Sequence, residues 1–171
     1  MTDAERFVWM TAVLRRRPDA WASVTGSSEY PRIHGTVRFY QTSCGVIVTA
    51  QISGLPQSTA VCETQFFGFH IHEGNKCSGN QEDPFADAGT HYNPESCPHP
   101  AHAGDLPPLL GNHGLAVQLF LTNRFTVQEI TGRTVIIHMQ PDDFTTQPAG
   151  NAGAKIACGI IHSIEPQEES I

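Results

Sequence analysis

The stretch TVRFYQTSCGVIVTAQIS, residues 36–53, determines the class of fold that this chain adopts. Apolar side chains recur at every second position in each half of it, as at Val37 and Phe39 and again at Val46 and Val48. Such alternation is typical of a half-buried strand, and the TSCG between the halves contains turn-forming residues. The stretch therefore predicts two antiparallel strands joined in a hairpin.

Five further segments have the same β-branched or alternating character and are bounded by Gly, Pro, Asn or Ser. With the hairpin included, the predicted strands span residues 21–25, 36–41, 46–53, 65–72, 114–121, 134–138 and 156–164. Many short antiparallel strands separated by long loops indicate an all-β sandwich or flattened barrel. The chain has 171 residues, of which 39% are hydrophobic and 16% charged, which is enough for one domain with a substantial core.

The first residues predict a short helix ahead of the β-rich part. The sequence TDAE at residues 2–5 has the pattern of a capping box, and apolar residues follow it at near-helical spacing until Pro18 stops the helix. We therefore expect a helical extension over residues 1–18 and a β-sandwich domain over residues 19–171. The apolar stripe is expected to pack on the sandwich or on a neighbouring subunit.

Composition limits the partners and the compartment. The chain carries a formal net charge of −7, has a pI near 5.6 and contains no apolar run long enough to cross a membrane. We therefore expect no membrane partner. Three arginines at 15–17, just before Pro18, are typical of the solvated end of a helix, so we also expect no nucleic acid partner. The N-terminus lacks the long apolar centre of a secretory signal, so we expect a cytoplasmic protein. The sequence leaves open whether the chain forms a homodimer.

The histidines are grouped in a way that indicates metal binding. His70 and His72 are separated by one residue in an apolar run, and residues two apart in a strand share a face, so both imidazoles can bind one ion. The alternative is two exposed polar residues on a half-solvated strand. His138 ends a β-branched run, and a lone histidine there is more often structural than a ligand.

A second group lies in a segment rich in Pro and Gly, which predicts a loop. A long loop without secondary structure is usually functional or disordered. Its candidate ligands are His91, His99, His102 and Asp105. Three nitrogen ligands and one oxygen ligand suit a tetrahedral zinc site. The alternative is a histidine-rich loop in solvent.

Five segments, in this order along the chain, resemble the copper/zinc superoxide dismutase family. They are GFHIHE at 68–73, HYNP at 91–94, HAGDL at 102–106, GRTVIIH at 132–138 and GNAGAKIACG at 150–159. The resemblance covers residues from about 21 to 164. It implies a Greek-key β-sandwich with long metal-binding loops that disproportionates superoxide to dioxygen and hydrogen peroxide. Copper would carry the electron, since zinc has no redox chemistry.

The resemblance also implies the roles of individual residues. The copper ligands would be His70, His72, His91 and His138, and the zinc ligands would be His91, His99, His102 and Asp105. His91 would then bridge the two ions and donate a proton to the departing peroxide. Asp142 matches an aspartate that links a copper ligand to a zinc ligand in the family and fixes both rings. The alternative for Asp142 is a turn residue, and Asp143 competes with it for either role.

The chain departs from the family where the substrate anion is guided. Most members have an arginine beside the copper at the position of Lys155, and a lysine keeps the charge but loses the planar fork of the guanidinium. We therefore expect a less efficient site, and the alternative is an ordinary surface lysine at the start of a strand. The segment 139–154 contains no lysine or arginine, so steering by a charged loop should be weak, with Lys76 as one more nearby cation.

Five cysteines cannot all pair within one chain, and an odd number without a signal peptide usually indicates reduced thiols. The resemblance nevertheless implies a disulfide between Cys77 and Cys158, with two buried free thiols as the alternative. The remaining cysteines are Cys44, Cys62 and Cys97. Cys97, beside His99, is a further candidate metal ligand.

Two other classes of function stay open. The chain could be a structural domain stabilised by zinc, with a copper site that stays empty. It could also store or deliver copper without turnover. The complete copper set implied by the resemblance argues against the structural domain.

Overall fold

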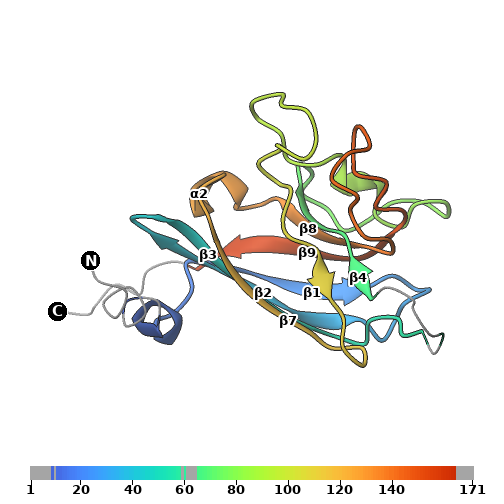
Figure 1. Ribbon diagram of the computed structural model, residues 1–171, viewed down its shortest axis with the longest axis horizontal. Coiled ribbons are helices and arrows are strands. Elements are labelled where there is room, and N and C mark those ends of the chain that lie inside the picture. Colours follow the sequence, from blue (N-terminus) through green and yellow to red (C-terminus); the bar gives the residue numbers. More distant parts are fainter. Residues whose placement is uncertain (1–8, 10, 59, 61–64, 165–171) are drawn as a thin grey trace.

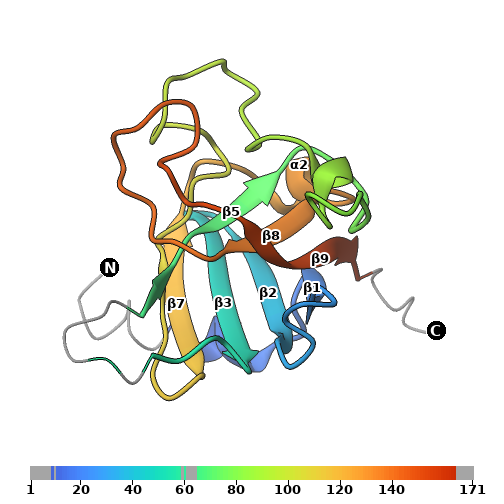
Figure 2. The same cartoon turned by 90° about the vertical axis from the view of Figure 1, so that its right-hand side faces the viewer.

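Seven antiparallel strands form one curled sheet in the computed structural model, which describes residues 9, 11–58, 60 and 65–164 (Figure 1). Their order across the sheet is β5-β8-β9-β1-β2-β3-β7. These strands are β1 (Ala20–Gly26), β2 (His34–Thr42), β3 (Gly45–Ser53), β5 (Phe69–His72), β7 (Ala116–Thr122), β8 (Thr134–His138) and β9 (Lys155–Ser163). Figure 2 shows that the sheet curls into a half-barrel, so β5 and β8 face β3 and β7 across the core.

The predicted hairpin is confirmed: β2 pairs with β3, and Thr42 lies opposite Gly45 at the turn. Every other predicted strand is also present, with ends shifted by at most two residues. The prediction of one strand over residues 65–72 was wrong, because the chain forms β4 (Phe66–Phe67) and β5 on either side of Gly68. A Cβ atom at position 68 would lie 2.9 Å from Cβ of Ala152 and 3.1 Å from Cβ of His138. The backbone at Gly68 therefore passes so close to these residues that it leaves little room for a side chain.

Three short elements were not predicted. The strand β6 (Leu109–Leu110) pairs with β4, η1 (Ala86–Ala88) is a single 3-10 turn, and α2 (Val127–Ile130) is one turn of α-helix. Thr126 caps α2 in a capping box with Glu129. Each element is too short to produce a periodic apolar pattern in the sequence.

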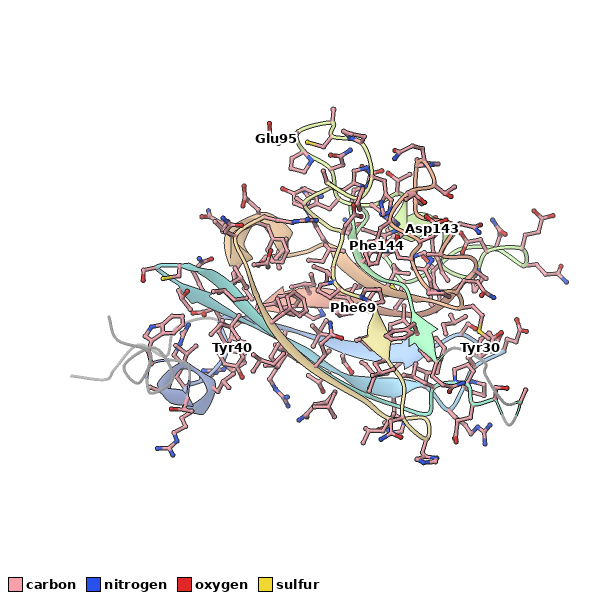
Figure 3. The ribbon with its side chains drawn as sticks, in the orientation of Figure 1. Tyr30, Tyr40, Phe69, Glu95, Asp143 and Phe144 are labelled. Atoms are coloured by element: carbon pink, nitrogen blue, oxygen red, sulfur yellow. A yellow bond between two sulfur atoms is a disulfide. The ribbon has the colours of Figure 1, made fainter. Side chains whose placement is uncertain are left out.

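The core lies inside the half-barrel and fixes the strand that carries two of the candidate ligands. Phe69 and Ile71 of β5 are fully buried with Phe39 of β2 and Ile137 of β8, and Figure 3 shows Phe69 in the interior. Because side chains alternate across a strand, His70 and His72 point to the opposite face of β5. That face is covered by the loops over residues 73–108 and 139–154, which lie on the same side of the sheet (Figures 1 and 2).

The N-terminal helix is described at residue 9 and over residues 11–15. Val13 is buried against Tyr40 and Ile47, with Trp9 packed beside them. Figure 3 shows Tyr40 beside the helix. The described part of the helix therefore packs on the outer face of the sheet, as one of the two sequence alternatives predicted. The predicted capping box at residues 2–5 lies outside the described residues, and the division into two parts at residue 18 stays a prediction.

No helix within the described ranges has both the length and the apolar character to span a membrane.

Cys77 and Cys158 form a disulfide, as the resemblance implied. It joins the loop that follows β5 to the last strand, and Phe85 and Ile136 pack around it. Among the cysteines that the structure describes, Cys44 and Cys97 are free. The fifth cysteine, at position 62, lies outside the described residues.

Removal of this disulfide should lower the stability of the metal-free protein. The bridge closes a loop with a sequence separation of 81, and a cross-link of this kind stabilises a protein by about 2–5 kcal/mol, in part by restricting the unfolded chain. We expect a double Cys77→Ala and Cys158→Ala variant to unfold at a lower urea concentration than the wild type. Cys44→Ala, at an exposed free cysteine, serves as the control, and equal unfolding midpoints for all three proteins would contradict the prediction.

Candidate metal centre

Two groups of buried side chains converge beside β5. In each group the four possible ligand atoms lie within 4.8 Å of one another. The first group is His70, His72, His91 and His138, and the second is His91, His99, His102 and Asp105. His91 belongs to both. The structure therefore brings together all seven of the predicted metal ligands.

Backbone pairing explains how distant segments reach one place. β5 and β8 are antiparallel neighbours, which brings the end of β8, with His138, close to His70. On the other edge of β5, Ile71 donates a backbone hydrogen bond to Gly104 and accepts one from Tyr92, at 2.9 and 2.8 Å. The loop that carries the second group is thus held on the free edge of β5 like an additional strand.

In the first group, the hydrogen bonds of the rings leave nitrogens available for a cation. His72 and His138 each place Nδ1 within 3.0 Å of a backbone carbonyl, of Gly89 and Gly153 respectively. A carbonyl can only accept, so both Nδ1 atoms carry the proton and both Nε2 atoms have a lone pair. These Nε2 atoms lie 3.2 Å apart, and His70 Nδ1 is buried without a hydrogen-bond partner. Two lone pairs that face each other at this distance repel, and a cation bound to both nitrogens would remove the repulsion.

In the second group, a single carboxylate faces three rings. The distances from the Asp105 carboxylate oxygens to Nδ1 of His91, His99 and His102 are 2.7, 3.0 and 3.3 Å. Three imidazole nitrogens and one carboxylate around a point are the donor set of a tetrahedral zinc site.

The buried atoms without a partner support the same interpretation. Within the described residues, the buried side-chain nitrogens that make no hydrogen bond are Nδ1 of His70, Nε2 of His91, and Nδ1 of His99 and of His102. All of them belong to the two groups. Buried polar atoms are normally hydrogen-bonded, so four such nitrogens in one place indicate that metal ions complete the site.

Asp142 connects the two groups. Its Oδ2 accepts a hydrogen bond from His70 Nε2 at 2.7 Å, and its Oδ1 accepts one from His99 Nε2 at 2.9 Å. Burial alone would raise the pKa of Asp142, but the hydrogen bonds from His70, from Phe144 N and from His99 outweigh it and lower the pKa to about 2. The carboxylate is therefore ionised and fixes both rings. Gly150 leaves room for it, since a Cβ there would lie 2.1 Å from Asp142 Oδ1.

The sequence left open which of the two aspartates links the histidines and which is a turn residue, and Asp143 has the turn role. It is exposed, and its carboxylate accepts hydrogen bonds from the backbone nitrogens of Thr145 and Thr146 at 2.9 and 2.8 Å. Figure 3 shows it on the loop after β8, above the sheet. Asp143 is thus the turn residue.

Burial keeps His70, His72 and His138 of the first group neutral. It lowers the pKa of His70, lowers that of His72 well below its usual value, and lowers that of His138 to about 3; the neighbouring histidines act in the same direction. Neutral imidazole is the form that binds a metal, so these rings need not lose a proton at neutral pH before they do so.

A cavity of about 510 Å³ opens over the first group. It is lined in part by His72, His91 and His138, and by the charged side chains of Glu82, Asp83 and Lys155. The alternative for Lys155, an ordinary surface lysine, does not agree with the structure, because only 15% of its side chain is exposed and it is paired with Asp83.

The other candidates are not part of the site. Lys76 is exposed and does not line this cavity. Cys97 is half-buried, and neither group of candidate ligands includes it.

Sequence reasoning missed Asp83 and Arg124. Arg124 Nη1 donates to the carbonyl oxygen of Pro100 at 3.0 Å and lies 3.2 Å from the carbonyl oxygens of His102 and Asp105, so it holds the second group's loop. Both residues contact segments that are distant in the sequence, so no local sequence pattern indicates their roles.

Comparison with known proteins identifies the family. The family model described as copper/zinc superoxide dismutase matches residues 33–161. The chain is 33% identical over 151 residues to a superoxide dismutase [Cu-Zn] of Deinococcus radiodurans, covering 78% of this chain and 79% of that protein. It is 32% identical over 141 residues to one of Photobacterium leiognathi, covering 74% and 78% of the two chains.

A solved structure agrees with these matches. The copper/zinc superoxide dismutase from Brucella abortus superposes with a TM-score of 0.68 at 25% sequence identity, covering 82% of this chain and 98% of that one. The all-β sandwich fold expected from the sequence is therefore confirmed. On the family model, the relatives and the fold together, this chain belongs to the copper/zinc superoxide dismutase family.

Proposed function

We propose that this protein disproportionates superoxide to dioxygen and hydrogen peroxide at a copper/zinc pair held by the two groups. The observation that carries the proposal is the position of the His91 ring. Its Nδ1 lies 2.7 Å from Asp105 in the second group, and its Nε2 is buried among the first group without a hydrogen-bond partner. One imidazole can therefore serve two ions, one on each nitrogen.

The donor atoms assign each ion to one group. Copper would be held by His70, His72, His91 and His138, because an all-nitrogen set suits copper. Zinc would be held by His91, His99, His102 and Asp105, a set of three nitrogens and one oxygen. When bound, copper supplies the one-electron redox change that zinc lacks.

The side chains around the cavity supply the other requirements of the reaction. His91 lines the cavity, and its Nε2 can hold a proton close to where peroxide forms while Nδ1 stays in the second group. Lys155 lines the same cavity and places a positive charge beside the path of the anion. Its single ammonium group orients a diatomic anion less well than a guanidinium fork would.

The disulfide and the N-terminal sequence bear on the compartment in different ways. The disulfide between Cys77 and Cys158 is typical of proteins from oxidising compartments, whereas the N-terminal sequence predicted a cytoplasmic protein. A homodimer stays a prediction, which the mass of the protein in solution would test.

Metal content measured together with superoxide consumption distinguishes the proposed enzyme from the two alternatives. After loading with both metals, we expect one copper and one zinc per chain and rapid consumption of superoxide. Zinc alone without turnover would instead support a structural domain. Copper without turnover would support storage or delivery.

The proposed role of Asp142 can be tested against its neighbour. Asp142→Asn replaces two acceptor oxygens by one oxygen and one amide donor, so one of the two bound rings loses its partner. Loss of such an outer contact typically weakens metal binding about 10–100-fold. We expect this loss for zinc and copper in competition with a chelator.

Asp143→Asn is the matched control, since it makes the same chemical change one residue away without touching a histidine. Its metal affinities should equal those of the wild type. The role assigned to Asp142 would be refuted if the two variants bound both metals equally well.

A further inference from the structure

Lys155 does not present a free ammonium group to the cavity. Its Nζ donates a hydrogen bond to Asp83 Oδ2 at 2.5 Å and lies 3.4 Å from the carbonyl oxygen of Phe85. The positive charge that should attract an anion is therefore opposed by a carboxylate in direct contact. Asp83 is 72 positions away in sequence and reaches Lys155 from the loop after β5.

The backbone around Asp83 holds this carboxylate in place. Its Oδ1 accepts a hydrogen bond from the backbone nitrogen of Phe85 at 3.0 Å, and its carbonyl oxygen accepts one from Asn80 at 2.9 Å. The loop is also tied to β9 by the disulfide at Cys158, three residues after Lys155. An exposed ion pair normally loses much of its benefit to side-chain entropy. Here the carboxylate is already ordered, so the pair should persist.

The charges that line the cavity do not favour an anion. Apart from histidines, the charged residues in its wall are Glu82, Asp83 and Lys155, which sum to −1. Charges beyond about 8 Å are largely screened at physiological ionic strength, so these side chains act directly on the field at the entrance, together with any cations bound by the ligand groups. The net charge of −7 on the whole chain offers no compensating attraction.

We propose that Asp83 limits the entry of small anions into the cavity by neutralising Lys155, and so sets the catalytic efficiency of the enzyme. The inference rests on the proposed function for the identity of the anion, which is superoxide. Asp83 is a specificity-determining residue rather than a catalytic one, because it acts through Lys155. An asparagine at this position keeps an oxygen for the Phe85 nitrogen and removes the charge, so Asp83→Asn isolates the electrostatic effect.

The first measurement is the second-order rate constant for superoxide in the enzyme loaded with both metals. We expect Asp83→Asn to raise kcat/KM about 3–10-fold at low salt, within the range of electrostatic steering, and the gain should shrink as salt is added. Glu82→Gln removes the same charge from the cavity wall without contacting Lys155, and should raise the rate by less than about twofold. In a Lys155→Gln background, Asp83→Asn should raise the rate no more than Glu82→Gln does in the wild-type background.

The second measurement needs neither metals nor turnover. In the metal-free protein, acetylation of each lysine by acetic anhydride is followed by peptide mass spectrometry, with the exposed Lys76 as internal reference. Asp83→Asn should raise the relative labelling of Lys155 several-fold, and Glu82→Gln should leave it unchanged.

Three results would overturn the role of Asp83. These are equal rate gains in the Asp83 and Glu82 variants, a gain from Asp83→Asn that is as large in the Lys155→Gln background as in the wild-type background, and unchanged labelling of Lys155. A loaded wild-type protein that consumes no superoxide would contradict the proposed function instead. The labelling of Lys155 would still decide whether Asp83 holds the ammonium group, so the two failures are distinguishable.

Discussion

The sharing of the His91 ring between two ligand groups is the interaction on which the rest of the site depends. A single imidazole can face both groups only if its loop is fixed relative to the strand that carries His70 and His72. The free edge of β5 provides this: Ile71 exchanges backbone hydrogen bonds with Tyr92 and Gly104. An exposed sheet edge invites pairing with other chains. In this protein the edge is covered by the loop that carries the second group.

Two arginines that belong to neither ligand group hold this loop. The Arg133 guanidinium lies 3.9 Å from the centre of the Tyr92 ring, next to His91, and its Nη1 donates to the carbonyl oxygen of Glu73 at 3.1 Å. Arg124 holds the other end of the loop through the carbonyl oxygens described above. A planar guanidinium that is always charged can stack on a ring and donate at its edge at the same time. The position of His91 therefore depends on contacts well outside the ligand groups.

The sequence predicted the parts of the structure that have a local pattern. Alternation predicted the hairpin of β2 and β3, and the spacing of His70 and His72 placed both on one face of a strand. The residue types of the loop indicated His99 and Asp105 as candidate zinc ligands, whereas the role of Asp142 came only from resemblance, because a loop has no periodicity from which a direction can be inferred. Asp83 was missed for a related reason: its partner lies 72 positions away and becomes a neighbour only through the fold.

Burial of the site favours metal binding but lowers the stability of the metal-free protein. It lowers the pKa of His72 and His138, so the rings are neutral and need not release protons on binding an ion. In the metal-free protein the same burial leaves His70 Nδ1 and His91 Nε2 without a partner, and leaves Nδ1 of His99 and of His102 facing only the shared Asp105 carboxylate. Each nitrogen without a partner costs about 1–3 kcal/mol, which a bound cation would recover. The metal-free state is therefore less stable than it would be with every buried nitrogen paired. Its ligands, however, are already in place and deprotonated.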